Sequence, residues 1–210
     1  DTLSHILLRH QERGLEVLYP LLSESACMDS AQALLSVPKG KVLIVTGFFC
    51  FCQGETDGPL GSHFLALALK ELGYQPILVT DKFSSIYFSQ ENYPLLLYDF
   101  DSDAKAMLTA VHPTAMIAIE RCGRARDARY YSMKKKDISD VTPPADELFL
   151  LKPDSCVSIG IGDGGNEIGM GNYSDSLEKS GKIIPSCVRT EHTIVATVSN
   201  WGAYGLIAAM

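Results

Sequence analysis

Short runs of apolar and β-branched residues recur along the chain, and each is followed by turn-forming residues and then by a helix-like pattern. Within a run, the apolar residues occupy nearly consecutive positions, as in KVLIVT and TAMIAIE, which is typical of strands covered by helices on both faces. This alternation predicts an α/β protein, a doubly wound three-layer sandwich with a mostly parallel sheet. We expect strands over residues 41–46, 77–80, 95–98, 115–119, 156–161 and 193–199.

Helices are predicted between these strands. Residues 59–72 begin with a proline suited to a first helical position, and Gly73 follows their end as a stop signal. Residues 101–111 form a second predicted helix, and residues 1–36 are predicted to be helical in two pieces. An apolar stripe on those two pieces is expected to pack on the sheet; its members are Leu3, Ile6, Leu7, Leu15 and Leu18.

Composition and charge narrow the class of protein. The 210 residues are 46% hydrophobic and 20% charged, as in an ordinary globular protein, and with no repeat or linker they predict a single domain over residues 1–210. The net charge of −7 disfavours nucleic-acid binding, and no stretch is apolar and long enough to predict a membrane span. The cysteines lack zinc or C-x-x-C spacing, so we expect reduced thiols at Cys27, Cys50, Cys52, Cys122, Cys156 and Cys187.

Acidic and amide side chains follow several of the predicted strands. The carboxyl ends of parallel strands meet at one edge of a sheet, so these side chains are expected to lie together and to need a neutralising cation. An oxygen-only ligand set favours magnesium or manganese. The predicted ligands of this divalent metal are Asp57, Glu120, Asp163, Asn166 and Glu167. The alternative is that acids such as Asp57 and Glu167 cap helices or lie in solvent.

A basic stretch, ERCGRARDARYYSMKKKD, follows the fourth predicted strand. Arginine binds carboxylate or phosphate with two parallel hydrogen bonds, so Arg121 and Arg124, nearest the strand end, are predicted to contact a small anionic substrate. Asn200, after the sixth strand, is the third predicted substrate contact. The lysines over residues 134–136 fit a solvated turn better than a binding site.

The segment GIGDGG also fits the G-x-G-x-x-G pattern of dinucleotide sites at Gly160, Gly162 and Gly165. No acidic residue stands about 20 residues further on, and Asp163 would face the pyrophosphate. We therefore interpret the glycines as positions where the backbone approaches a metal and its substrate closely.

Five motifs together carry a resemblance to a known family. VTGF, ETDGP, AIERCGRARDARYYSMKKKDI, IGDGGNEIGMG and VSNWGAYGL lie within residues 42–206 and resemble the motif set of the D-glutamate cyclase C-terminal domain family. The resemblance implies a Rossmann-like fold, a metal site at the five oxygen ligands named above, and Arg121 and Arg124 beside it. Because the family continues past the last residue here, we expect a chain truncated at its C-terminus.

The implied reaction is that of a hydro-lyase, in which the amine of D-glutamate attacks its γ-carboxyl carbon and water leaves, giving 5-oxo-D-proline. A divalent metal would polarise the carboxyl group, and Glu120 or Glu167 would accept the amine proton. Two alternatives remain at this point: a manganese- or magnesium-dependent phosphatase, and a ligand-sensing domain without turnover. Family members occur within a mitochondrial animal protein and alone in prokaryotes, which implies the mitochondrial matrix or the cytoplasm. The sequence leaves homo-oligomerisation open.

Overall fold

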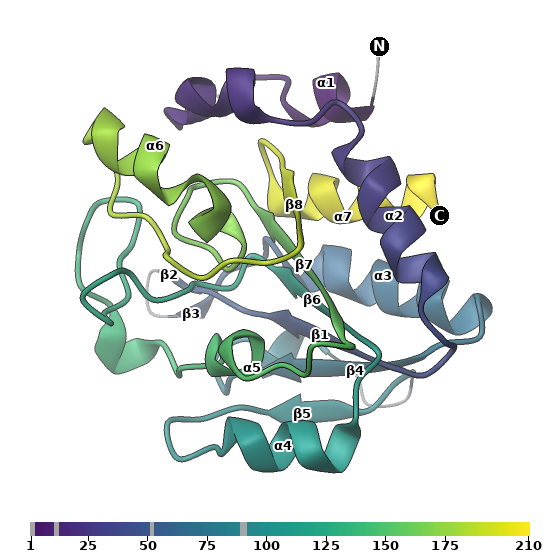
Figure 1. Ribbon diagram of the computed structural model, residues 1–210. Helices are drawn as coiled ribbons and strands as arrows, with labels where there is room; N and C mark the ends of the chain where they lie inside the picture. Colours follow the sequence, from purple (N-terminus) through teal and green to yellow (C-terminus); the bar gives the residue numbers. More distant parts are fainter. Residues whose placement is uncertain (1–2, 11–12, 51–52, 89–91) are drawn as a thin grey trace.

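A six-stranded parallel sheet forms the centre of the molecule (Figure 1). The computed structural model describes residues 3–10, 13–50, 53–88 and 92–210. The strands lie in the order β5-β4-β1-β6-β7-β8. Their bounds are β1 Lys41–Thr46, β4 Gln75–Thr80, β5 Leu95–Leu97, β6 Ala115–Ile119, β7 Val157–Gly162 and β8 His192–Val195. The chain builds outward from β1 to β5 and then returns to add β6, β7 and β8, so the order reverses between β1 and β6. Ligands of open α/β sheets bind at such a reversal.

Helices cover both faces of the sheet, as the consecutive apolar residues of the strands predict (Figure 1). Val42 and Ile44 of β1 pack in one core cluster with residues of α2, α3 and α7, whereas Leu43 and Val45 pack in the opposite cluster with residues of α4 and α5. The predicted three-layer Rossmann-like α/β architecture is confirmed. The α-helices are α1 Leu3–Leu7, α2 Ala26–Ser36, α3 Pro59–Glu71, α4 Ala104–Val111, α5 Glu147–Leu150, α6 Ser174–Ser180 and α7 Ser199–Ala209.

Short elements complete the fold around the sheet. A two-stranded antiparallel hairpin, β2 Phe49–Cys50 with β3 Gln53–Gly54, follows β1. The 3-10 helices are η1 Leu15–Leu21, η2 Ser85–Tyr87, η3 Ser139–Val141 and η4 Met170–Tyr173. None of the described helices combines the length and the apolar composition that a membrane crossing requires. The five described cysteines are free thiols, and Cys52 lies outside the described residues.

The N-terminal segment and the last strand differ in part from expectation. In the predicted apolar stripe, Leu7, Leu15 and Leu18 are buried, but Ile6 is 44% exposed. That part of the prediction was wrong because α1 has only five residues and buries one side of a single turn. The strand expected over 193–199 ends at Val195, and α7 begins at Ser199.

Candidate metal centre

Three carboxylates meet where β1, β6 and β7 end. Thr46 pairs with Ile119, and Ile119 pairs with Ile161, so the residues that follow these strands leave the sheet at one edge. Asp57, Glu120 and Asp163 each offer a carboxylate oxygen there, and the three oxygens lie within 4.8 Å of one another. The structure thus brings together three of the five predicted ligands at the reversal of strand order.

The carboxylate of Asp57 lies at the N-terminus of α7 and caps this helix. Its Oδ2 accepts a hydrogen bond from the backbone N–H of Ser199 (3.0 Å), and its Oδ1 accepts one from the N–H of Asn200 (2.7 Å). Asn200 does the same for α3: its Oδ1 accepts from the N–H groups of Gly58 (3.0 Å) and Gly61 (2.7 Å). Asp57, which precedes α3, therefore caps α7, and Asn200, which lies in α7, caps α3. This gives Asp57 the capping role of the alternative interpretation as well as a place in the carboxylate cluster.

The same contacts account for Asn200, a predicted substrate contact. Besides its Oδ1 bonds, its Nδ2 donates to the carbonyl of Thr56 (3.2 Å). The amide thus has a structural role that sequence reasoning did not foresee.

Glu120 is buried, with 4% of its surface exposed, and its backbone adopts a φ of +48°, in the left-handed region. Side chains avoid this region unless the surroundings enforce it, and such residues gather at functional sites. The Oγ of Ser199 donates a short hydrogen bond to Oε2 of Glu120 and fixes its carboxylate. Burial, and then the charges of Asp163 and Glu167, raise the pKa of Glu120 well above its ordinary value.

Gly58 allows this close packing next to Asp57. Its φ is +94°, and a Cβ there would lie 2.6 Å from Oγ1 of Thr46 and 2.9 Å from Cβ of Glu120. A side chain at this position would therefore push the β1 loop away from Glu120 and would separate Asp57 from the other two carboxylates.

Asp163 has one bonded and one unbonded carboxylate oxygen. Its Oδ1 accepts a hydrogen bond from Nη1 of Arg13 at 2.5 Å, although the two residues lie 150 positions apart. Its Oδ2 is buried and has no hydrogen-bond partner among the described residues. Burial, and then the charge of Glu167, raise the pKa of Asp163 to about 9, against the opposing effect of Arg13. A buried oxygen that lacks a donor is a position that a cation or a proton must fill.

Glu167 is not one of the three clustered carboxylates, and both Glu167 and Asn166 have backbone partners. Oε1 and Oε2 of Glu167 accept hydrogen bonds from the N–H groups of Gly164 and Gly165, both at 2.7 Å. Burial raises the pKa of Glu167, while these backbone bonds lower it. Nδ2 of Asn166 donates to the carbonyl of Tyr131 (2.7 Å). The metal-ligand role predicted for these two residues stays a prediction.

Arg121 has a structural partner instead of an exposed anion site. Its side chain is 1% exposed, forms a short ion pair with buried Asp81, and donates to the carbonyls of Gly47 (2.9 Å) and Pro143 (2.6 Å). This pair could not be predicted from the residues around Arg121, because Asp81 follows a different strand, β4. With its guanidinium enclosed, Arg121 has no surface on which an anionic substrate can bind.

Arg124 is likewise occupied by acidic neighbours. Its Nε donates to Oδ2 of buried Asp146 at 2.7 Å, and its Nη2 lies 3.2 Å from Oε1 of Glu147. These bonds tie the loop after β6 to the start of α5. Arg124 thus has a structural role, and its predicted contact with a substrate stays a prediction.

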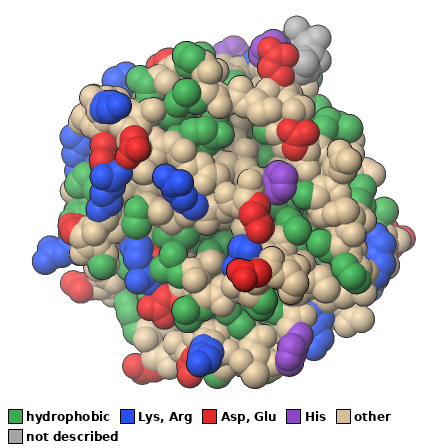
Figure 2. Space-filling view, viewed as in Figure 1, with side chains coloured by type: hydrophobic (Ala, Val, Ile, Leu, Met, Phe, Trp, Pro, Cys, Tyr) green, Lys and Arg blue, Asp and Glu red, His purple; other side chains and the backbone are tan. Residues whose placement is uncertain are grey.

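The other two arginines of the basic stretch also have acidic partners. Arg126 pairs with Asp175 and with Glu178 of α6 (3.1 Å), and Arg129 pairs with Asp137 (3.1 Å). Basic and acidic side chains lie side by side over this part of the surface, on the left in Figure 2. The lysines over residues 134–136 are exposed, as expected of a solvated turn.

Gly160, the first glycine of the G-x-G-x-x-G match, serves packing within the protein. A Cβ on Gly160 would lie 2.5 Å from the carbonyl oxygen of Ile168 and 2.6 Å from Cα of Gly169. The segment after β7 therefore folds back directly onto the strand, which explains why residue 160 has no side chain.

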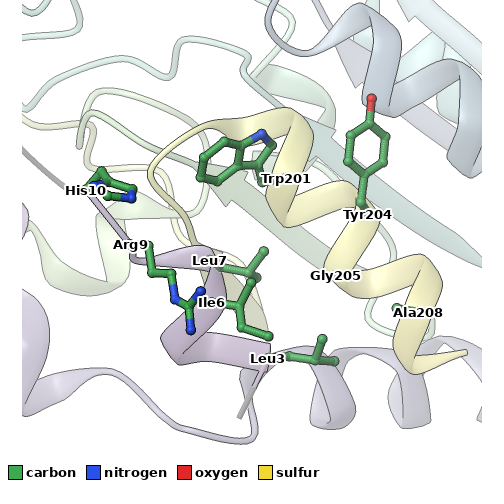
Figure 3. A pocket seen from close by; sticks show the side chains of 9 residues that line it. All are labelled: Leu3, Ile6, Leu7, Arg9, His10, Trp201, Tyr204, Gly205 and Ala208. Atoms are coloured by element: carbon green, nitrogen blue, oxygen red, sulfur yellow. The ribbon is translucent and has the colours of Figure 1, made fainter. Parts of the chain in front are cut away.

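An apolar cleft of about 440 Å³ runs between α1 and α7 (Figure 3). Leu7, Trp201 and Tyr204 line it, and Arg9 and His10 lie at its rim. The cleft begins at the first turn of α7, whose Ser199 and Asn200 contact the carboxylates, so it is adjacent to the acidic cluster but chemically distinct from it.

The chemistry of the donors fits a hard divalent cation. Three carboxylates with oxygens within 4.8 Å of one another, one of them with a buried unbonded oxygen, match the ligand type that magnesium and manganese prefer. The identity of the metal is not fixed by this geometry. Sequence reasoning missed Arg13, because nothing in the residues around it indicates that the N-terminal segment reaches the end of β7.

Comparison with known proteins agrees with the motifs. The sequence model of the family described as "D-glutamate cyclase-like, C-terminal" matches residues 4–210. The chain is 32% identical over 215 aligned positions to a human protein named "D-glutamate cyclase, mitochondrial", an alignment that covers 88% of this chain and 35% of the human protein. The chain thus spans about a third of that relative's length. It belongs to the D-glutamate cyclase-like, C-terminal family.

Proposed function

We propose that this chain is a divalent-metal-dependent hydro-lyase that converts D-glutamate to 5-oxo-D-proline. The observation that carries the proposal is the convergence of Asp57, Glu120 and Asp163 within 4.8 Å, in a chain related to a protein named D-glutamate cyclase. The relative's name also says "mitochondrial", and we extend that location to this chain only if its source is eukaryotic.

Asp57, Glu120 and Asp163 would hold the metal, which we propose to be manganese or magnesium. When bound, such an ion polarises a carboxyl group and stabilises the negative charge that develops on its oxygens. The protein keeps these ligands in place before the ion arrives: the α7 N–H groups orient Asp57, Ser199 orients Glu120, and Arg13 orients Asp163. Little reorganisation is therefore needed on binding.

Glu167 is the proposed proton acceptor. The ammonium group of D-glutamate must lose a proton before its nitrogen can attack the γ-carboxyl carbon, and an acceptor works best when its pKa lies near the working pH. Burial raises the pKa of Glu167, which favours proton uptake, and Glu167 lies outside the three carboxylates assigned to the metal. Glu120, the other predicted acceptor, serves as a metal ligand in this proposal.

The test measures loss of D-glutamate by chiral chromatography, with manganese and with EDTA. We expect manganese-dependent turnover that D163N lowers by more than about 100-fold, because loss of a group that merely orients a metal ligand already costs about 10–100-fold. E167Q should retain manganese binding and lose turnover. D140N, which removes an exposed acid on η3, is the matched control and should behave as wild type.

The same experiment separates the alternatives. Metal-dependent hydrolysis of p-nitrophenyl phosphate without loss of D-glutamate would favour the phosphatase, because a divalent ion beside carboxylates also activates water for phosphoester hydrolysis. A thermal shift with D-glutamate but no product would favour a sensing domain.

A further inference from the structure

The N-terminal segment places a positive charge against one of the three carboxylates, that of Asp163. Nη1 of Arg13 lies 2.5 Å from Oδ1 of Asp163, and the Arg13 side chain is 43% exposed whereas that of Asp163 is 1% exposed. Arg13 therefore spans from the buried carboxylates to the protein surface.

The fold holds this segment in place on both sides of Arg13. Before it, the backbone carbonyls of Leu7 and Arg9 accept hydrogen bonds from the N–H and Oγ1 of Thr197, both at 2.8 Å. After it, Leu15 and Leu18 are buried in a cluster with Met170, Leu177, Ile183 and Val195. Arg13 thus reaches Asp163 from anchored backbone, so its position is a property of the fold.

An anionic substrate needs a positive partner at this site. Glu55, Asp57, Glu120, Asp163 and Glu167 all act electrostatically on one another or on Arg13. The negative charge of five carboxylates exceeds the positive charge of a divalent ion. A dicarboxylate substrate would therefore be repelled unless a cationic side chain lies beside the metal. Arg121 is enclosed with Asp81, and Arg124 pairs with Asp146 and Glu147, which lie outside these five carboxylates. Arg13, in contrast, forms its ion pair with Asp163, a member of the cluster.

We propose that Arg13 binds the α-carboxylate of the substrate, and so selects α-amino dicarboxylates. This inference rests on the proposed function. It adds the residue that recognises the α-carboxylate, which takes no part in ring closure. A guanidinium can bond two carboxylates along different edges, so Arg13 can hold Asp163 and the substrate at once. The partial exposure of Arg13 puts it where a substrate entering from solvent meets the carboxylates.

Calorimetric titration of the manganese-saturated protein tests this role, carried out in the E167Q background so that D-glutamate is bound but not converted. Two ligands are compared: D-glutamate, and its analogue with an α-carboxamide in place of the α-carboxylate. We expect R13Q to weaken D-glutamate binding by about 10–100-fold, the range for a charge-assisted hydrogen-bonded pair, and to change binding of the carboxamide by less than about threefold. The affinity of R13K for D-glutamate should lie between those of wild type and R13Q, because lysine keeps the charge but lacks the planar guanidinium.

R9Q is the matched control. It removes the same charge from the same segment, at an exposed residue at the rim of the apolar cleft, and should leave both affinities unchanged. Equal weakening of both ligands in R13Q would overturn the inference, since it would mean that Arg13 acts only through Asp163 and the metal. An R13Q protein that binds D-glutamate like wild type would overturn it too. Both results leave the proposed function standing if wild type still converts D-glutamate, whereas a wild type that binds manganese but neither ligand would refute function and inference together.

Discussion

Replacing Asp163 by Asn should have opposite effects on the metal-free protein and on metal binding. In the absence of metal, the pKa of Asp163 is raised from 3.8 to about 9, first by burial and then by the charge of Glu167. Asn has nearly the same shape as Asp but never acquires a charge. The variant should therefore stabilise the metal-free fold while removing a ligand.

The sign follows from proton linkage. Between pH 4 and pH 9, folded Asp163 keeps a proton that the unfolded chain releases, so the free energy of unfolding falls as pH rises by about 1.4 kcal/mol per pH unit. At pH 7, about three units above the unfolded pKa, the accumulated loss is about 4 kcal/mol. The raised pKa already includes the opposing effect of Arg13, so no further correction applies. D163N should thus be more stable than wild type by about 4 kcal/mol at pH 7 and by about 1.5 kcal/mol at pH 5.

Urea unfolding in EDTA at the two pH values measures this difference, and D140N again serves as the control. Repeating the pH 7 experiment with manganese should stabilise wild type and leave D163N unchanged. A D163N protein that is no more stable than wild type at pH 7 in EDTA would refute the reasoning, because it would mean that the Asp163 carboxylate is stabilised by its surroundings without a metal.

Three further predictions concern helix capping, the buried ion pair and proton release. Asn200→Ala should lower the free energy of unfolding in EDTA by about 1–2 kcal/mol, because α3 loses the acceptor for two N–H groups; no loss of stability would contradict this capping role. Arg121→Met should lower the free energy of unfolding by about 3–5 kcal/mol, because it leaves Asp81 buried without its partner. Adding Asp81→Asn should recover part of that loss, and a double variant as unstable as the single one would argue against the pair. Manganese binding at pH 7 should release at least one proton, because the pKa values of Asp163 and Glu120 are raised and the metal needs both ionised; binding enthalpies that do not depend on the ionisation enthalpy of the buffer would contradict this.

The sheet and the three central carboxylates were predictable because both follow from local pattern and topology. Consecutive apolar residues indicate buried parallel strands, and parallel strands bring their carboxyl ends together whatever their order. Asp57, Glu120 and Asp163 could therefore be placed together from their positions after β1, β6 and β7. The α7 helix was not predicted, since its glycines weaken the helical signal of a segment that is buried by α3 and the sheet.

The roles of the arginines depend on partners that the sequence does not pair. Arg121 and Arg124 follow a strand end, as substrate-binding residues often do, yet Asp81 and Asp146 come from other elements and occupy them. Arg13 shows the reverse case: its segment has no motif, and the bonds of Thr197 before it and the burial of Leu15 and Leu18 after it bring it to Asp163. Such long-range pairing requires the folded structure.

Anomalous diffraction from crystals soaked in manganese tests the central claim most directly. A single strong peak should lie within about 2.5 Å of carboxylate oxygens from Asp57, Glu120 and Asp163, and Oδ2 should be the oxygen that Asp163 contributes. A fully soaked crystal with no peak there, or with its strongest peak at another group of residues, would contradict the account.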